Sequence, residues 1–102
     1  MILMRLTERQ IQAIKQVVTT FAGEKAQVIL FGSRVDDDQK GGDVDLLVTL
    51  NNDVEHPAEL AAKISSHLMR SFQGRKVDVL LSAPNLKTLP IHSIATQKGV
   101  LL

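Results

Sequence analysis

Residues 28–34 read Val-Ile-Leu-Phe-Gly-Ser-Arg, and residues 43–50 read Asp-Val-Asp-Leu-Leu-Val-Thr-Leu. Each stretch combines a short apolar run, typical of a buried strand, with small or polar residues at one end. A glycine-serine turn therefore follows the first predicted strand, and two aspartates open the second. This arrangement predicts a turn that can hold phosphate next to carboxylates that can hold a metal ion.

The two aspartates, Asp43 and Asp45, share one face of the predicted strand 43–50. Side chains alternate between faces along a strand, so these carboxylates lie about 6–7 Å apart. Aspartate is uncommon in strands, and a divalent cation would offset the repulsion between two like charges. Mg²⁺ is commonly held by one or two carboxylates plus substrate phosphates. The alternative is that Asp43 merely starts the strand and that Asp45 is solvated.

Asp78 interrupts the apolar run of another predicted strand, residues 76–81. If this strand neighbours the strand 43–50, Asp78 can join the face that carries Asp43 and Asp45. The alternative is an edge-strand charge that opposes aggregation. Arg75 and Lys76 already supply charge at the start of this strand, so we favour a role for Asp78 in the site.

Gly32, Ser33 and Arg34 form the predicted phosphate-holding turn. Glycine adopts backbone conformations closed to other residues, and backbone N–H groups around the serine can point at an anion. The Arg34 guanidinium can contact phosphate oxygens. An ordinary turn with a solvated arginine is the alternative, and the turn gains significance only from the carboxylates that follow it.

The order Gly32-Ser33-Arg34, Asp43-Val44-Asp45 and Val77-Asp78-Val79 resembles the minimal nucleotidyltransferase family of the DNA polymerase beta superfamily. The resemblance extends over residues 6–102. Many members have ten residues between the serine and the first aspartate, whereas this chain has nine. The difference falls in the polar loop 36–42, where a one-residue deletion costs little.

The resemblance implies metal-assisted nucleotidyl transfer from ATP. Asp43 and Asp45 would hold two Mg²⁺ or Mn²⁺ ions, and Asp78 would help to position the ion nearer the attacking hydroxyl. Asp78 would also be a candidate acceptor of the hydroxyl proton. Gly32 and Ser33 would hold the β- and γ-phosphates, with Arg34 beside them.

The resemblance also implies a partner. Stand-alone members of the family are often antitoxins paired with a HEPN-domain ribonuclease toxin, and some transfer AMP to a tyrosine of that toxin. This chain contains no tyrosine, so such a modification would occur on the partner. Two alternatives remain open: a binding module that neutralises its partner by contact alone, and nucleotidyl transfer to a small molecule or an RNA end.

Composition sets further expectations. A chain of 102 residues, 44% hydrophobic, is long enough for one domain, which we expect over residues 1–102. The net charge of +1 argues against direct nucleic-acid binding. The absence of cysteine excludes disulfide and thiolate chemistry. No signal peptide or membrane span is visible, so we expect a cytoplasmic protein without a membrane partner.

The pattern along the chain predicts an α/β (α+β) fold, a small mixed sheet with helices packed on one face. Thr7 and Gln10 form a capping-box pattern at the start of a first helix, and Gly23 follows its end. Pro57 begins a second helix that ends near Gly74. The predicted strands are residues 27–31, 43–50, 76–81 and an edge strand 100–102, with a last short helix over residues 90–99. The fold agrees with the polymerase-beta-like nucleotidyltransferase fold that the resemblance implies.

Overall fold

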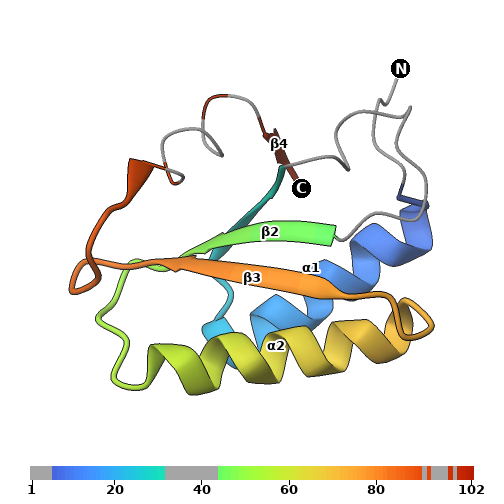
Figure 1. Cartoon of the computed structure of the whole chain (residues 1–102), viewed down its shortest axis with the longest axis horizontal. Coiled ribbons are helices and arrows are strands. Elements are labelled where there is room, and N and C mark those ends of the chain that lie inside the picture. Colours follow the sequence, from blue (N-terminus) through green and yellow to red (C-terminus); the bar gives the residue numbers. More distant parts are fainter. Residues whose placement is uncertain (1–5, 32–43, 91, 93–96, 98) are drawn as a thin grey trace.

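The computed structural model describes residues 6–31, 44–90, 92, 97 and 99–102 of the chain. Its elements follow the order α1 (Glu8–Ala22), β1 (Gln27–Phe31), β2 (Val44–Thr49), α2 (Pro57–Ser71), β3 (Val77–Ser82) and β4 (Val100–Leu101). Both helices lie on one side of the sheet, and the chain after β3 passes to the other side (Figure 1). The predicted α+β class, with helices packed on one face, is confirmed.

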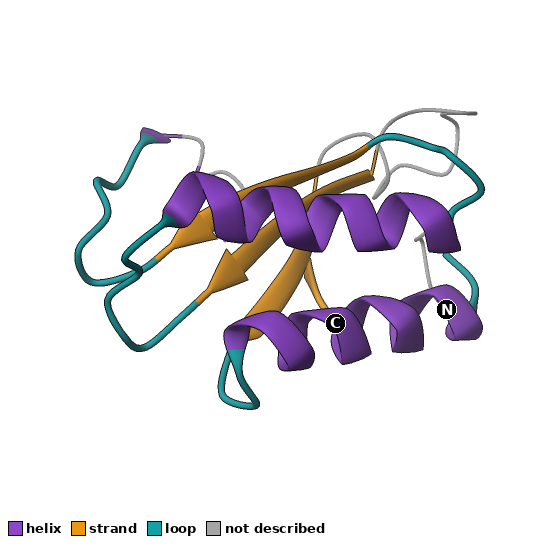
Figure 2. Cartoon of the chain, turned by 90° about the horizontal axis from the view of Figure 1, so that it is seen from below, coloured by secondary structure: helices purple, strands orange, loops and turns teal. Residues whose placement is uncertain are grey.

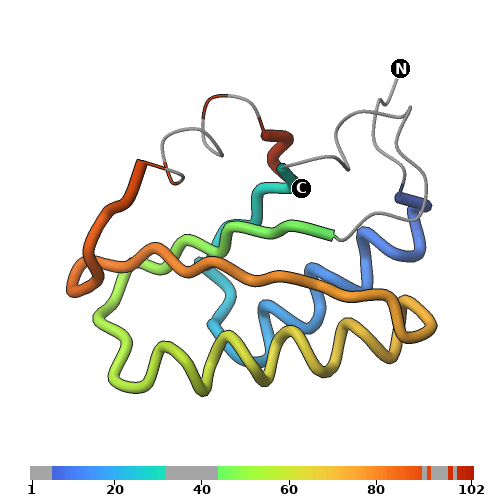
Figure 3. Tube along the Cα trace, in the orientation of Figure 1, coloured from blue at the N-terminus to red at the C-terminus, as the bar shows by residue number. Residues whose placement is uncertain are grey.

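The four strands form a mixed sheet in the order β3-β2-β1-β4. β1 pairs antiparallel with both β2 and β4, whereas β2 and β3 run parallel. Parallel neighbours need a crossover connection, and α2 supplies it, as the path of the chain shows (Figure 3). The prediction that residues 100–102 contribute an edge strand is confirmed by β4.

Local sequence signals account for the ends of both helices. The Thr7 hydroxyl accepts a hydrogen bond from the Gln10 backbone, and the Gln10 side chain accepts one from the Thr7 backbone, which confirms the capping box. α1 ends at Gly23, whose φ of 97° suits glycine. α2 begins with Pro57 at its first position, as predicted. It ends slightly before Gly74, because Gln73 already takes a left-handed conformation with φ 57°.

Some predicted boundaries differ from the structure. β3 begins and ends one residue later than the predicted strand 76–81, and β2 ends at Thr49. Asp43, the predicted first residue of that strand, lies outside the described residues. Most of the predicted last helix also lies outside them. In the described part of the chain, neither helix is both long and apolar enough to cross a membrane.

The hydrophobic core fills the space between the sheet and the helices. α1 and α2 lie side by side across the strands (Figure 2). Every second residue of each strand faces them, as the period of a strand requires. The most deeply buried members are Leu30 of β1, Val44, Leu46 and Val48 of β2, Val77 of β3, Ile14 and Val18 of α1, and Ile64 and Leu68 of α2.

The opposite face of the sheet is only partly open. Leu47 of β2 points away from the helices, because its neighbours Leu46 and Val48 face them. Even so, only 2% of Leu47 is exposed. The chain after β3 passes to this side of the sheet (Figure 1), and His92 connects it to the edge strand, with its Nε2 3.0 Å from the Leu81 carbonyl oxygen. The middle of this face, at Leu47, is therefore covered rather than open to solvent.

Candidate active site

Asp45 and Asp78 are brought together by the pairing of β2 and β3. The two residues are direct partners in the register of these parallel strands. Neighbouring strands lie about 4.8 Å apart, and the side chains of paired residues project from the same face. Both carboxylates therefore lie on the face opposite the helices. The condition set for Asp78, that its strand should neighbour that of Asp45, is confirmed.

Phe31 completes this row on the other side of Asp45. It is the antiparallel register partner of Asp45 and the last residue of β1. The chain leaves the described part after Phe31 and re-enters it at Val44. Both attachment points of residues 32–43 thus lie at the end of the sheet that carries the Asp45–Asp78 pair. Asp43, Gly32, Ser33 and Arg34 belong to this connection, outside the described residues.

Lys76 also belongs to this site, although its position in the sequence predicted only a charge that opposes aggregation at the start of the strand. Its Nζ lies 3.7 Å from Asp78 Oδ1, and the two side chains are 65% and 49% exposed. Residues two apart in an extended chain share a face, so this spacing was the signal that could have identified the contact. The ammonium group reduces the repulsion between Asp45 and Asp78, and it also competes with any other cation for Asp78.

The donor set fits a hard divalent cation. Carboxylate oxygens on adjacent strands are ligands of the kind that Mg²⁺ and Mn²⁺ prefer, with phosphates and water filling the remaining positions. Over residues 6–31, 44–90, 92, 97 and 99–102, no group of three His, Asp or Glu side chains converges on one metal position. The described site is a two-carboxylate site, and the predicted third ligand Asp43 is not among these residues.

Next to the carboxylates, the same face becomes apolar. Ile29, Leu47 and Leu80 form the adjacent row, since Leu47 pairs with Ile29 on one side and with Leu80 on the other. Leu47 at its centre is only 2% exposed, so one flank of the Asp45–Asp78 pair is apolar. Charges beside an apolar surface interact more strongly than charges in bulk water.

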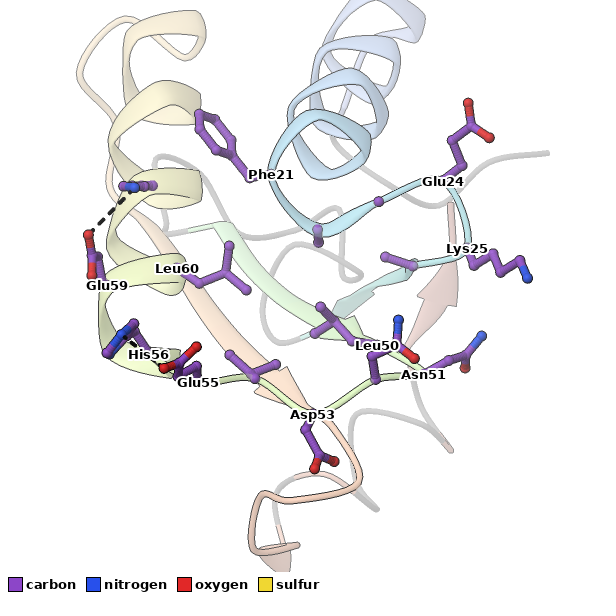
Figure 4. A pocket seen from close by; sticks show the side chains of 16 residues that line it. Phe21, Glu24, Lys25, Leu50, Asn51, Asp53, Glu55, His56, Glu59 and Leu60 are labelled. Carbon is purple, nitrogen blue, oxygen red and sulfur yellow. Dashed lines mark ion pairs between the residues drawn. The ribbon is translucent and has the colours of Figure 1, made fainter.

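A groove lies at the opposite end of the sheet. Its volume is about 870 Å³. The lining comes from residues 21–26 at the end of α1 and just after it, from residues 50–56 between β2 and α2, and from Glu59, Leu60 and Lys63 of α2 (Figure 4). We call it the α1–α2 groove. Asp45 stands near the start of β2 and Leu50 follows its end, which places them about 16 Å apart. No sequence pattern predicted this groove, because its lining comes from separate segments without a common motif.

The model of a family described as nucleotidyltransferase domain matches residues 11–101. A search of curated proteins found no match. The matched region contains every described strand and nearly all of α1.

Proposed function

Because the chain belongs to the nucleotidyltransferase domain family, we propose that it is a protein adenylyltransferase that acts as an antitoxin. In this proposal it transfers AMP from ATP to a tyrosine of a partner HEPN-domain ribonuclease toxin. The family assignment covers nucleotidyl transfer in general, and members generally use a nucleoside triphosphate and a divalent metal. The acceptor, the nucleotide and the antitoxin role are the proposed part.

The observation that carries the proposal is the register pairing of Asp45 with Asp78. Two carboxylates held on adjacent strands repel each other unless a cation lies between them, and the partial exposure of both leaves them accessible to a substrate. A bound divalent metal would stabilise negative charge on the phosphate oxygens during displacement. Asp45 and Asp78 would hold it, with Asp43 as the proposed further ligand.

The proposed reaction is a displacement at the α-phosphorus of ATP, in which the chain binds the phosphates and accepts one proton. The acceptor hydroxyl oxygen attacks the α-phosphorus of ATP, the bond to the bridging oxygen breaks, and pyrophosphate leaves. In this proposal Asp78 receives the hydroxyl proton, and the half exposure of its carboxylate at the edge strand β3 supports this role. Gly32, Ser33 and Arg34 are the proposed phosphate contacts. Since the chain has no tyrosine, an acceptor tyrosine must come from another molecule.

The test uses the protein together with the protein encoded next to it, Mg²⁺ and ATP labelled at the α-phosphate. Wild type is compared with Asp43→Asn and Asp45→Asn, and with Glu8→Gln as a control for loss of an exposed carboxylate of α1. We expect AMP on a tyrosine of the neighbouring protein with wild type and Glu8→Gln, and none with the two aspartate variants.

The other outcomes separate the alternatives. Label on a small molecule or an RNA end, with none on the neighbouring protein, would replace protein modification by another acceptor class. A stable complex that silences the neighbouring protein without any label, in wild type and variants alike, would establish the binding module instead. Undiminished transfer by both aspartate variants would refute the assigned site.

A further inference from the structure

The α1–α2 groove is a second surface feature whose residues take no part in the Asp45–Asp78 site. Its centre is apolar: Phe21 of α1, Leu50 after β2 and Leu60 of α2 are each only partly buried. Leu50 and Leu60 lie towards the middle of the groove, and Phe21 lies above them between the helices (Figure 4). Three separate elements thus contribute apolar surface to one concave site.

The groove is held in shape by contacts across its boundaries. The Asn85 side chain makes two hydrogen bonds with the backbone of Val54, in the connection before α2. The Val54 N–H donates to Asn85 Oδ1 at 2.9 Å, and the Val54 carbonyl accepts from Asn85 Nδ2 at 2.8 Å. The Phe21 ring contacts the His67 ring, with centroids 4.7 Å apart, which ties α1 to α2. A surface that is already ordered loses little entropy when it binds.

Charge around the groove is unbalanced. Four carboxylates line it, those of Glu24, Asp53, Glu55 and Glu59, against the two lysines Lys25 and Lys63. Lys63 lies 3.5 Å from Glu59, so the charges of this pair offset each other, and His56 Nε2 lies 3.9 Å from Glu55 Oε1. Glu24, Asp53 and Glu55 lie on the rim of the groove, with the side chains of Glu24 and Asp53 directed away from its apolar centre (Figure 4). Carboxylates therefore outnumber lysines by two around the groove, whereas the whole chain carries a net charge of +1.

We propose that the α1–α2 groove docks a basic segment of a partner protein. An apolar side chain of that segment lies against Phe21, Leu50 and Leu60, and lysine or arginine side chains on either side of it pair with the surrounding carboxylates. Charge complementarity selects this occupant, because the same carboxylates repel acidic peptides and the phosphates of nucleic acids. The inference stands independently of the proposed function.

Docking at this groove leaves the Asp45–Asp78 pair accessible. The two sites lie at opposite ends of β2, about 16 Å apart. A partner segment of five or more extended residues spans that distance. A partner held at the groove can therefore present a different part of its surface to the carboxylates.

The experiment records amide chemical shifts of the full ¹⁵N-labelled chain during peptide titrations. The probe is a twelve-residue peptide with two central leucines and four flanking lysines. One control peptide has glutamate in place of lysine, and another has serine in place of leucine. We expect the lysine-leucine peptide to shift the amides of residues 21–26 and 50–63 and to bind several-fold more weakly when salt rises from 50 to 200 mM.

Variants localise the binding. The double variant Asp53→Asn/Glu55→Gln should weaken the lysine-leucine peptide about fivefold, and Leu60→Ser should weaken it without changing the salt dependence. Glu8→Gln, which removes an exposed carboxylate outside the groove, should bind as wild type does. Asp45→Asn should also bind normally, so that failure of the proposed catalysis and failure of docking are separate results.

Several results would overturn the proposal: equal binding of the glutamate peptide, shifts confined to the Asp45–Asp78 end of the sheet, no shifts at all, or equal weakening by Glu8→Gln. Displacement of the peptide by a short RNA would also contradict it, because the groove would then bind phosphate. Retained binding by Leu60→Ser and by the double variant would place the peptide elsewhere.

Discussion

Asp45 of β2 and Asp78 of β3 are paired residue to residue across two parallel strands. Thirty-two residues lie between them in the chain. The crossover through α2 brings β3 beside β2 in the register that aligns the two aspartates. Apolar residues on the opposite face of both strands fix this register, because a slip by one residue would expose Val44 and Val77. Core packing therefore sets the geometry of the carboxylates.

This pairing predicts that the two carboxylates act together. Asp45→Asn and Asp78→Asn should each lower nucleotidyl transfer at least about 100-fold, since a metal ion contributes several kcal/mol to stabilising transition-state charge. The free energy of unfolding, measured by urea denaturation without metal, should change by less than about 1 kcal/mol, because the side chains keep their size and the Lys76–Asp78 ion pair is exposed. A variant that lost activity by unfolding would show a lower urea midpoint, and full activity in either variant would contradict the joint role.

Lys76 should weaken metal binding at Asp78. Its ammonium group lies 3.7 Å from Asp78 Oδ1, so a metal ion must displace it. Lys76→Gln should bind Mn²⁺ several-fold more tightly, measured by electron paramagnetic resonance of free Mn²⁺, and should change the free energy of unfolding by less than about 1 kcal/mol. The exposed Lys15→Gln serves as a control, and unchanged Mn²⁺ affinity in Lys76→Gln would show that the contact does not compete.

Asn85 should be needed to hold the connection before α2. Its amide makes two hydrogen bonds with the backbone of Val54, a residue that is only 8% exposed. Asn85→Ala should lower the free energy of unfolding by about 1–3 kcal/mol, because two backbone groups lose their partners. Asp in its place retains an acceptor for the N–H but offers no donor for the carbonyl, so we expect partial loss. Asn52→Ala, exposed nearby, should have little effect.

Gln73 occupies a position that favours glycine. Its φ of 57° follows the end of α2, where Gly74 N–H bonds to the Met69 carbonyl at 2.8 Å and Gln73 N–H faces the Arg70 carbonyl. Gln73→Gly should raise the free energy of unfolding by up to about 1 kcal/mol, since a left-handed conformation strains a residue with a Cβ atom. Thermal unfolding would measure this, with Gln12→Gly, inside α1, as the control that should destabilise.

Side chains protect the outer edge of β3. The carbonyls of Lys76 and Ser82 accept hydrogen bonds from β2 and the residue that follows it, so by alternation those of Val77 and Leu81 point outwards. Ser65 Oγ donates to the Val77 carbonyl. At the Leu81 carbonyl the partner is His92 Nε2, 3.0 Å away.

The tautomer of His92 follows from its other contact, because the Leu89 N–H donates to Nδ1 and the proton therefore resides on Nε2. Removing both caps in Ser65→Ala/His92→Ala should expose the edge to strand addition. We expect the double variant to sediment as larger species than wild type at equal concentration. Identical sedimentation, with the fold retained by circular dichroism, would show that other features protect this edge.

Much of the fold was predictable from local patterns. The capping box at Thr7, the proline start of α2 and the alternation of apolar residues in β2 depend on neighbours within a few positions, and the structure confirms each of them. The ends of the strands could not be predicted from local patterns alone. The end of β3 shifted by one residue, because hydrogen bonding with β2 rather than side-chain preference sets that end.

The sequence by itself determined which residues carry the chemistry: carboxylates within apolar strands, in an order that matches the nucleotidyltransferase family over residues 11–101. Only the tertiary structure decided that Asp45 and Asp78 are direct partners, that Lys76 contacts Asp78, and that the α1–α2 groove exists. The reason is physical. Strand order and register arise from packing of distant segments around a shared core, and no local pattern encodes which strands become neighbours.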